Sequence, residues 1–284
     1  MLRLDVCTIG QWTSRFYADC HMDDLEVAIE AARAGGTVVA AHFGAAPEPE
    51  FKGKFDPVTE VDRESEAAVI AIINDHRPAD PIMAEEGGGT RHAGRHWIVD
   101  PLDGTVNFVH ELPHISVSVA LYSGDIGLVG VVFDPLRDEL FAATSDGGAT
   151  LNGEEIRVSQ THELEKAIVA TGFPYDHDVK ADDLAVTLRD VLRRVAGIRR
   201  MGSAALDLAW VACGRYDAYW EFGIAPWDGA AGHILVREAG GVVTDPFGVH
   251  STPSMGQVVA ANQAIQPMIR AIVEESIGSS SRPS

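Results

Sequence analysis

The chain is poor in positive charge, and this shortage excludes whole classes of function. Lysine and arginine together number 22, against 42 aspartate and glutamate residues, which gives a formal net charge of −20. Nucleic acids and membrane surfaces are themselves anionic, so this balance argues against direct binding to either. An anionic small-molecule substrate fits only if bound cations reverse the local field, which points towards metal ions.

Cysteine and long apolar runs are also scarce. Cys7, Cys20 and Cys213 form no Cys-x-x-Cys pair and are odd in number, which fits a reducing, cytoplasmic compartment. No apolar run is long enough to cross a membrane, and residues 1–21 lack the apolar core of a signal peptide. Because those residues show no helical or strand period, we interpret 1–21 as an irregular N-terminal extension, for which a mis-assigned translation start is one explanation.

A length of 284 residues is enough to bury a large core. We expect one catalytic domain over residues 22–277, made of a metal-binding αβ half (22–158) and a second αβ half (159–277). The Gly- and Ser-rich residues 278–284 are expected to be a disordered tail.

Apolar spacing and turn residues predict an order of elements along the chain. Strand-like segments at 116–121, 128–133 and 140–143, separated by Gly124-Asp125 and Asp134-Pro135, predict an antiparallel meander. Helices are expected at 23–43, 63–75, 182–195, 204–213, 228–239 and 264–275, and further strands at 82–84, 167–171, 198–201, 216–222, 242–244 and 258–260. A meander followed by helix–strand alternation predicts layered sheets and helices that share one site.

Residues 44–57 are rich in Pro, Gly and charge, and we expect a mobile loop there. It carries Lys52 and Lys54, two of only four lysines in the chain. Two interpretations stay open: a solvated surface loop, or a loop whose cations close over a phosphate.

Oxygen ligands converge at one turn near the middle of the first half. A short apolar strand ends at Asp100, Pro101 interrupts regular pairing, and Asp103 follows in a tight turn. The two carboxylates, the Leu102 carbonyl and the Thr105 hydroxyl suit a hard divalent cation such as Mg²⁺ better than zinc. The structural alternative is an ordinary Asp–Gly turn beside a helix cap.

The spacing of the two aspartates excludes one kind of phosphatase chemistry. Haloacid-dehalogenase phosphatases need Asp-x-Asp, whereas Asp100 and Asp103 stand as Asp-x-x-Asp. We therefore expect metal-activated water and no aspartyl-phosphate intermediate. Gly104, next to Asp103, permits the backbone geometry that such a turn requires.

Three further carboxylate positions each have a structural and a functional interpretation. Glu85-Glu86 end a predicted strand and precede three glycines, a costly arrangement for a plain loop, which favours function. Asp62 matches a helix capping box with Thr59, and Asp228 follows a proline as a helix N-cap would. Equally, Asp228 could complete a dinuclear metal site, and it is the combination of clusters that carries the argument.

Two long motifs resemble those of the inositol monophosphatase superfamily. They are Trp97–Phe108 (WIVDPLDGTVNF) and Trp227–Gly241 (WDGAAGHILVREAGG), with Glu85-Glu86 and Asp56–Asp62 (DPVTEVD) in the expected order before them. The resemblance covers residues 23–275 and implies an α+β fold, a layered αβαβα sandwich of the inositol monophosphatase and fructose-1,6-bisphosphatase type. Two departures, Ala84 and Val106, are not expected to contribute ligand side chains.

The resemblance also implies a ligand set for two or three Mg²⁺ ions. Glu85, Asp100 and the Leu102 carbonyl would bind the first ion. Asp100, Asp103 and Asp228 would bind the second, and Glu85 would help to hold a weaker third ion through water.

Catalytic and substrate-binding roles follow from the same resemblance. Glu85 and Thr105, the latter supported by Asp62, would orient and deprotonate the attacking water. The substrate-binding set comprises Gly104, Thr105, Asp103, Gly202, Ser203, Ala204, Glu221 and Asp228, with the Gly104 and Thr105 amides receiving phosphate oxygens and Glu221 holding substrate hydroxyls.

The expected activity is Mg²⁺-dependent hydrolysis of myo-inositol 1-phosphate or a similar polyol phosphate. Histidinol phosphate is the strongest alternative substrate, followed by fructose 1,6-bisphosphate and 3′-phosphoadenosine 5′-phosphate. A different class of function is a partner-binding, transcription-associated factor. The resemblance further implies a homodimer and inhibition by Li⁺. The histidines form no zinc motif, and we expect His110 and His114 to have surface or packing roles.

Overall fold

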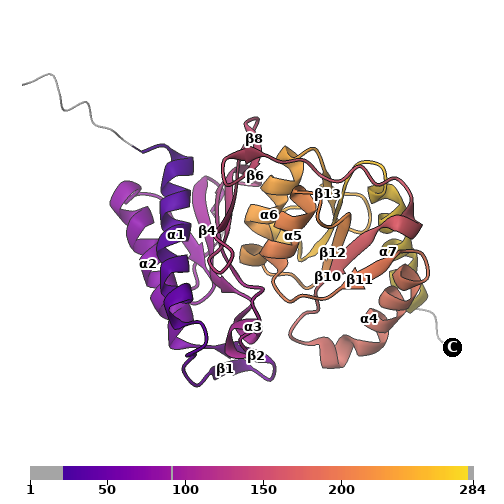
Figure 1. Ribbon diagram of the computed structural model, residues 1–284, viewed down its shortest axis with the longest axis horizontal. Coiled ribbons are helices and arrows are strands. Elements are labelled where there is room, and N and C mark those ends of the chain that lie inside the picture. The colour runs from indigo at the N-terminus through magenta and orange to yellow at the C-terminus, as the bar shows by residue number, and fades with distance from the viewer. Residues whose placement is uncertain (1–21, 91, 281–284) are drawn as a thin grey trace, which may run out of the picture.

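The computed structural model describes residues 22–90 and 92–280, so the predicted extension at 1–21 lies outside the described residues. Figure 1 shows five layers stacked along the long axis of the molecule: two helices, a sheet, two helices, a second sheet and two helices. This order is the αβαβα sandwich that the sequence predicts. No helix in the described part of the chain is both long and apolar enough to cross a membrane.

The first layer consists of α1 (Asp24–His42) and α2 (Glu60–His76). Each begins at a capping box, in which a side chain and a backbone amide at the helix start satisfy each other. α1 runs through Gly35 and Gly36 because its neighbours leave no room for side chains there. A Cβ on Gly35 would lie 2.7 Å from Val69 on α2, and one on Gly36 would lie 2.5 Å from the ring of Phe133 in the sheet.

The first sheet has seven strands in the order β3-β4-β5-β6-β7-β8-β9. Only β3 and β4 pair in parallel; the others form a continuous antiparallel meander, which confirms the sequence prediction. The strands are β3 (Ile82–Ala84), β4 (Arg95–Asp103), β5 (Ser116–Ser123), β6 (Ile126–Asp134), β7 (Glu139–Thr144), β8 (Gly148–Leu151) and β9 (Glu154–Glu155).

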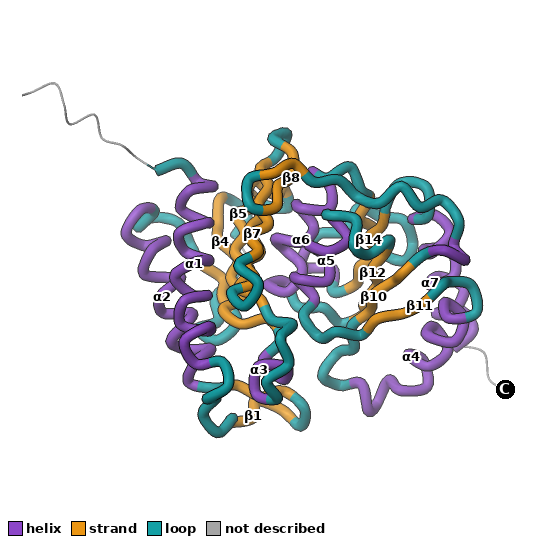
Figure 2. Tube along the Cα trace, viewed as in Figure 1, coloured by secondary structure: helices purple, strands orange, loops and turns teal. Residues whose placement is uncertain are grey.

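The central helices α5 (Ala204–Ala212) and α6 (Pro226–Glu238) pack between the two sheets. One hydrophobic cluster contains residues from β5, β6, both helices and the second sheet, so the halves at 22–158 and 159–277 bury apolar surface against each other. Figure 2 shows the same arrangement, with the two helices flanked by strands on either side.

The second sheet has five strands in the order β11-β10-β12-β14-β13, and α4 and α7 cover its outer face. Its elements are β10 (Ile168–Thr171), α4 (His177–Leu192), β11 (Gly197–Arg199), β12 (Ala218–Phe222), β13 (Val242–Thr244), β14 (Gln257–Ala261) and α7 (Gln266–Ser280). Two short 3₁₀ helices, Leu164–Lys166 and Pro253–Met255, lie in the connections.

Three differences from the sequence predictions concern the bounds of whole elements. Residues 44–57 contain an antiparallel hairpin, β1 (Glu50–Gly53) and β2 (Asp56–Val58), where we expected only a mobile loop. α4 begins at His177, five residues before the predicted start. The helix α7 continues to Ser280, so the tail predicted from residue 278 starts too early; residues 281–284 lie outside the described part.

Candidate active site

The turn after β4 brings the first group of predicted ligands together. β4 continues through Pro101 to Asp103, where we expected the strand to stop, because its register against β5 slips between Asp100 and Asp103 and the proline falls in that slip. Gly104 then adopts a left-handed conformation (φ 101°) and begins the short helix α3 (Thr105–Val109).

A cavity of about 300 Å³ lies beyond this turn, between the two halves of the chain. Its lining includes nearly every residue predicted for the site: Glu85, Asp100, Leu102, Asp103, Gly104, Thr105, Gly202, Ser203, Ala204, Glu221 and Asp228. Asp62 does not line it but reaches it through Thr105. Positions more than 140 residues apart in the chain therefore share one cavity.

The carboxylates in this cavity raise one another's pKa values. Burial raises the pKa of Asp100 well above its usual range, and the charges of Glu85, Asp103 and Asp228 raise it further. Burial likewise raises the pKa of Asp228 and takes that of Glu85 to about 7. So much buried negative charge is favourable only when a cation is near.

The donor set fits a hard divalent cation, because every candidate ligand atom is a carboxylate or carbonyl oxygen. Oδ1 of Asp56, at the edge of the cavity, is buried without a hydrogen bond and has only a 3.9 Å ion pair with Lys52, so it adds a further oxygen donor. No three His, Cys, Asp or Glu side chains in the described ranges yet form a complete ligand group.

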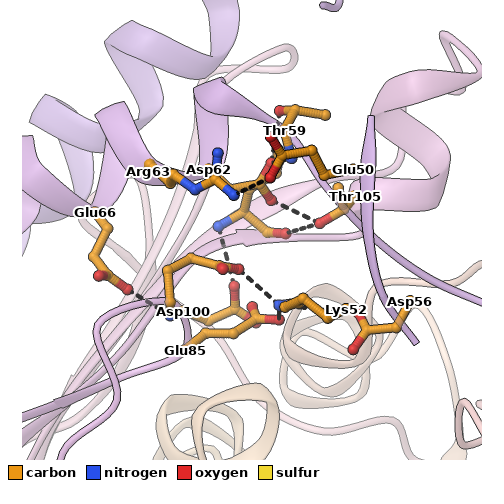
Figure 3. Close-up of polar contacts among 12 residues, drawn as sticks. Glu50, Lys52, Asp56, Thr59, Asp62, Arg63, Glu66, Glu85, Asp100 and Thr105 are labelled. Carbon is orange, nitrogen blue, oxygen red and sulfur yellow. Dashed lines mark hydrogen bonds and ion pairs between the residues drawn. The ribbon is translucent and has the colours of Figure 1, made fainter. Parts of the chain in front are cut away.

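Positive charge does reach this cluster from the β1–β2 hairpin. The ammonium nitrogen of Lys52 lies 2.8 Å from carboxylate oxygens of both Glu85 and Glu86, and 3.9 Å from Asp56 (Figure 3). Burial lowers the pKa of Lys52, but the two glutamates more than offset this and raise it overall. Lys52 is therefore not a freely solvated surface residue; because it lines the cavity, the interpretation that its loop closes over a phosphate stays a prediction. Lys54 instead pairs with Asp178 on α4.

The glycines after Glu85-Glu86 belong to a tight turn held by a residue that the sequence did not single out. Glu66 on α2 accepts a hydrogen bond from the Glu86 amide (2.8 Å), and a Cβ on Gly87 would lie 2.8 Å from the same carboxylate. Gly89 has a φ of 114°, and a Cβ there would lie 2.6 Å from the Ile82 carbonyl oxygen. The signal for Glu66 is its position one helical turn after Asp62.

Asp62, which lies outside the cavity lining, holds the side chain of Thr105. The Thr105 hydroxyl donates to Asp62 (2.8 Å) and lies 3.2 Å from the Leu102 carbonyl oxygen. The other oxygen of Asp62 accepts from the amide and hydroxyl of Thr59, which confirms the predicted capping box. Figure 3 shows the hydrogen bond between Asp62 and Thr105. Burial raises the pKa of Asp62 despite these hydrogen bonds.

The start of α5 holds Asp103 from the opposite half of the chain. The carboxylate accepts from the Ser203 hydroxyl (2.6 Å) and from the Ala205 amide (2.7 Å). Gly202, before the helix, has a φ of 89°. Asp103 therefore connects the two halves in addition to lining the cavity.

Asp228 and Glu221 come from neighbouring elements of the second half. α6 begins at Pro226, so Asp228 is its third residue and not the N-cap that we predicted; its carboxylate accepts from the Ala225 amide (3.0 Å). Burial raises the pKa of Glu221 to about 7, while a hydrogen bond from the Tyr219 hydroxyl opposes the rise.

The sequence did not identify Asp207, which lies on α5 and also lines the cavity. It pairs with His114, with 3.0 Å between Asp207 Oδ1 and His114 Nε2, and both side chains are almost fully buried. Burial raises the pKa of Asp207 well above its usual range and lowers that of His114 to about 4. The only local signal for Asp207 is an acid among apolar helix residues. The packing role expected for His114 agrees with its burial.

Comparison with known proteins identifies the family. The sequence profile of the Inositol monophosphatase family matches residues 22–278. Nus factor SuhB of Salmonella typhimurium is 44% identical over 251 residues, covering 85% of this chain and 92% of that protein. Inositol-1-monophosphatase of Synechocystis is 44% identical over 244 residues, covering 85% of each.

A solved structure leads to the same conclusion. The crystal structure of extragenic suppressor protein suhB from Bartonella henselae superimposes with a TM-score of 0.84 at 37% identity, covering 88% of this chain and 97% of that one. These matches confirm both the resemblance and the layered fold inferred from the sequence. The chain belongs to the inositol monophosphatase family.

Proposed function

We propose that this chain, a phosphatase by family, is a Mg²⁺-dependent phosphomonoesterase that hydrolyses myo-inositol 1-phosphate or a similar polyol phosphate to the alcohol and inorganic phosphate. The observation that carries the proposal is the single cavity lined by Glu85, Asp100, Asp103 and Asp228, whose buried charges need a cation. Phosphatase activity follows from the family; the metal and the substrate are our proposals.

Five oxygen donors would hold the metal ions. Glu85, Asp100 and the Leu102 carbonyl would hold one ion, and Asp100, Asp103 and Asp228 a second, with a weaker third near Glu85. Bound Mg²⁺ would neutralise the phosphate and lower the pKa of water at the site. The protein's own contribution is to hold Asp103 through Ser203 and the start of α5, and Asp228 through the first turn of α6.

Thr105 orients the attacking water in this proposal. Its hydroxyl proton is engaged by Asp62, so the oxygen lone pairs remain available on the side of the cavity. A water placed there donates one hydrogen bond to Thr105 and one to Glu85. Glu85 accepts the second proton as the water attacks phosphorus, the P–O bond to the alcohol breaks, and that proton then goes to the leaving alkoxide. The pKa of about 7 that burial gives Glu85 suits a group that takes up a proton near neutral pH.

The two ends of the substrate meet different groups, amide donors at the phosphate and a carboxylate acceptor at the alcohol. The backbone amides of Gly104 and Thr105 at the start of α3 would receive phosphate oxygens. The alcohol half would lie against Glu221 and the segment from Gly202 to Ala204, which face the same cavity from the second half. A buried carboxylate held by Tyr219 is a good acceptor for hydroxyl groups, which favours a polyol.

Phosphate release tests the proposal. The purified chain is assayed with inositol 1-phosphate, histidinol phosphate and fructose 1,6-bisphosphate, each with Mg²⁺ and with EDTA. We expect release only with Mg²⁺ and fastest from the inositol ester. Faster release from histidinol phosphate or the bisphosphate would replace the proposed substrate, and release that EDTA does not affect would overturn the proposed metal chemistry.

A second candidate function is a partner-binding role in transcription, and the relatives' names favour it. Several of the most similar curated proteins, at 42–44% identity, are named Nus factor SuhB. The net charge of −20 directs this proposal to a protein partner and not to RNA. Affinity capture with the unchanged chain and with Asp228→Asn tests this role. If both proteins retain the same transcription proteins, the role is supported; if neither retains any, the role is overturned.

Four further properties complete the proposal. We propose a cytoplasmic homodimer that is inhibited by Li⁺ and binds no membrane. Light scattering in solution tests the dimer, and titration of the phosphate-release assay with LiCl tests the inhibition.

A further inference from the structure

A second cavity, of about 310 Å³, adjoins the first at its outer end. Four residues line both cavities: Val106, Phe173, Tyr175 and Arg200. The remaining lining comes from the β1–β2 hairpin, from α3 and its end, and from the start of α4, which Figure 1 places at the same end of the molecule. A molecule bound in the first cavity has only these shared side chains between it and the second.

The two cavities differ sharply in charge. The first is lined by seven acidic residues, Asp56, Glu85, Asp100, Asp103, Asp207, Glu221 and Asp228. Among the described residues that line the second there is no aspartate or glutamate, but there are Lys54, Arg200, His110 and His177. In a chain with 42 acidic residues and 22 basic ones, a cavity without a carboxylate suits an anionic ligand.

Aromatic rings form much of the second cavity and fix its outer wall. Phe55 on the hairpin stacks on His177 of α4 with ring centroids 4.5 Å apart, and Lys54 lies over the Phe55 ring at 4.7 Å. The 2.7 Å ion pair between Lys54 and Asp178 closes the same contact between hairpin and helix. Because Asp178 already neutralises Lys54, Arg200 is the main positive charge left for a ligand.

Arg200 makes no hydrogen bond or ion pair with any described residue. Its guanidinium lies over the ring of Phe173 at 5.6 Å, and its charge lowers the pKa values of Asp207 and Glu221 against the rise that burial causes. A Cβ on Gly202 would lie 2.7 Å from Nη1 of Arg200, so the guanidinium lies close over the glycine backbone. An arginine that is hydrogen-bonded to no carboxylate, where the two cavities meet, keeps its N–H donors for a ligand.

We propose that Arg200 and the rings beside it form a subsite for a second anionic group carried on the alcohol half of the substrate. This inference rests on the proposed phosphatase function and adds a class of substrates, phosphate esters that carry a second anionic group. With the scissile phosphate at Gly104 and Thr105, the alcohol half extends past Arg200 towards the second cavity. A guanidinium binds phosphate or carboxylate through two parallel hydrogen bonds, and the rings contact the body of the ligand.

Steady-state kinetics on three esters test the subsite. The unchanged chain, Arg200→Gln and Arg199→Gln are compared on inositol 1-phosphate, fructose 1,6-bisphosphate and 3′-phosphoadenosine 5′-phosphate. Arg199 is the matched control, since its guanidinium donates to the carbonyl of Ile198 and lines neither cavity. A charge-assisted hydrogen bond corresponds to roughly a tenfold change or more.

We expect Arg200→Gln to raise KM for a bisphosphate about tenfold, with little change in kcat and less than twofold change on inositol 1-phosphate. Arg200→Lys should recover part of the loss, and Arg199→Gln should change nothing. A loss on the sugar bisphosphate alone identifies a second sugar phosphate as the ligand group, whereas a loss on the nucleotide alone identifies a nucleotide phosphate with its base on the rings.

Two results would overturn the subsite. One is an equal loss on all three esters, which would mean that Arg200 acts on the reaction itself. The other is unchanged kinetics with an altered oligomeric state on gel filtration, which would mean that a second copy of the chain covers the cavity.

If the unchanged chain releases no phosphate from any of the three esters, the proposed function is wrong and the subsite needs a separate test. Equilibrium binding of 3′-phosphoadenosine 5′-phosphate then decides the subsite. Binding weakened by Arg200→Gln but not by Arg199→Gln would support it, and binding insensitive to Arg200, or none, would overturn it.

Discussion

The ammonium nitrogen of Lys52 lies 2.8 Å from a carboxylate oxygen of Glu85, so the β1–β2 hairpin delivers a positive charge to a proposed metal ligand. The chain thereby partly neutralises its own acidic cavity. A metal ion that uses Glu85 must displace this lysine or share the carboxylate with it.

Lys52→Met should therefore strengthen metal binding. In alkaline buffer, where Glu85 is ionised, removing a competing ammonium worth about 1 kcal/mol raises Mg²⁺ affinity roughly fivefold. Isothermal titration calorimetry measures this directly. Lys54→Met is the control, because Lys54 pairs with Asp178 away from the acidic cluster. Equal affinities for Lys52→Met and the unchanged chain would show that the lysine does not compete with the metal.

The stability of the metal-free chain should fall as pH rises from about 6.5 to 8. Glu85 and Glu221 have folded pKa values of about 7, above their ordinary 4.5, so the folded state holds protons that the unfolded state has lost. That contribution disappears as pH rises through 7. The pKa of His114 is lowered to about 4, so its contribution makes the stability rise with pH, but only below about pH 6.5.

Thermal unfolding in EDTA across this pH range measures the effect. Mg²⁺ should then raise the melting temperature more at pH 8 than at pH 6.5, since its ligands are ionised at the higher pH. A melting temperature in EDTA that climbs between pH 6.5 and 8 would contradict the proposed origin of the Glu85 and Glu221 shifts.

The elements most accurately predicted are those with local signals. Thr59 and Asp62 lie three residues apart, so their capping box could be identified from the chain and is present. The turn from Asp100 to Gly104 could be identified for the same reason, because a proline and a glycine constrain the backbone within a few residues. The alternation of apolar residues in the meander is equally local.

The features that the sequence did not predict depend on distant partners. The contact of Lys52 with Glu85 spans 33 residues, and the pair of His114 and Asp207 spans 93. The β1–β2 hairpin was missed because its first strand is exposed on both faces and has no apolar alternation. No local pattern encodes such contacts, because the packing of elements that are distant in the sequence determines them.

Replacing a proposed metal ligand should separate activity from stability. Asp228→Asn removes a charge but keeps an oxygen that can accept from the Ala225 amide, so the fold should persist. We expect kcat/KM to fall roughly 100-fold or more, while the metal-free melting temperature rises because one repelling carboxylate is gone. Asp103→Asn should lose activity equally. Circular dichroism measures the melting temperature, and phosphate release measures the activity. Full Mg²⁺-dependent activity in either variant would show that the replaced residue is not part of the proposed site.

The pair of His114 and Asp207 should stabilise the fold through mutual contact. His114→Leu leaves a buried carboxyl without its partner, and Asp207→Leu leaves a buried imidazole, so each should cost about 1–3 kcal/mol of unfolding free energy. The double variant removes both polar groups and should cost less than the sum of the two single changes, by about 1 kcal/mol or more. Urea unfolding of the four proteins gives this coupling energy, with His110→Leu, an exposed histidine, as the control.

Activity gives this pair a second readout. Asp207 lies one turn after Ser203, whose hydroxyl holds Asp103, so loosening the start of α5 should also displace a proposed metal ligand. We expect kcat/KM to fall in both single variants even where the protein remains folded. Additive stability losses together with unchanged activity would mean that His114 and Asp207 are independent packing residues, and that Asp103 is held by Ser203 and Ala205 alone.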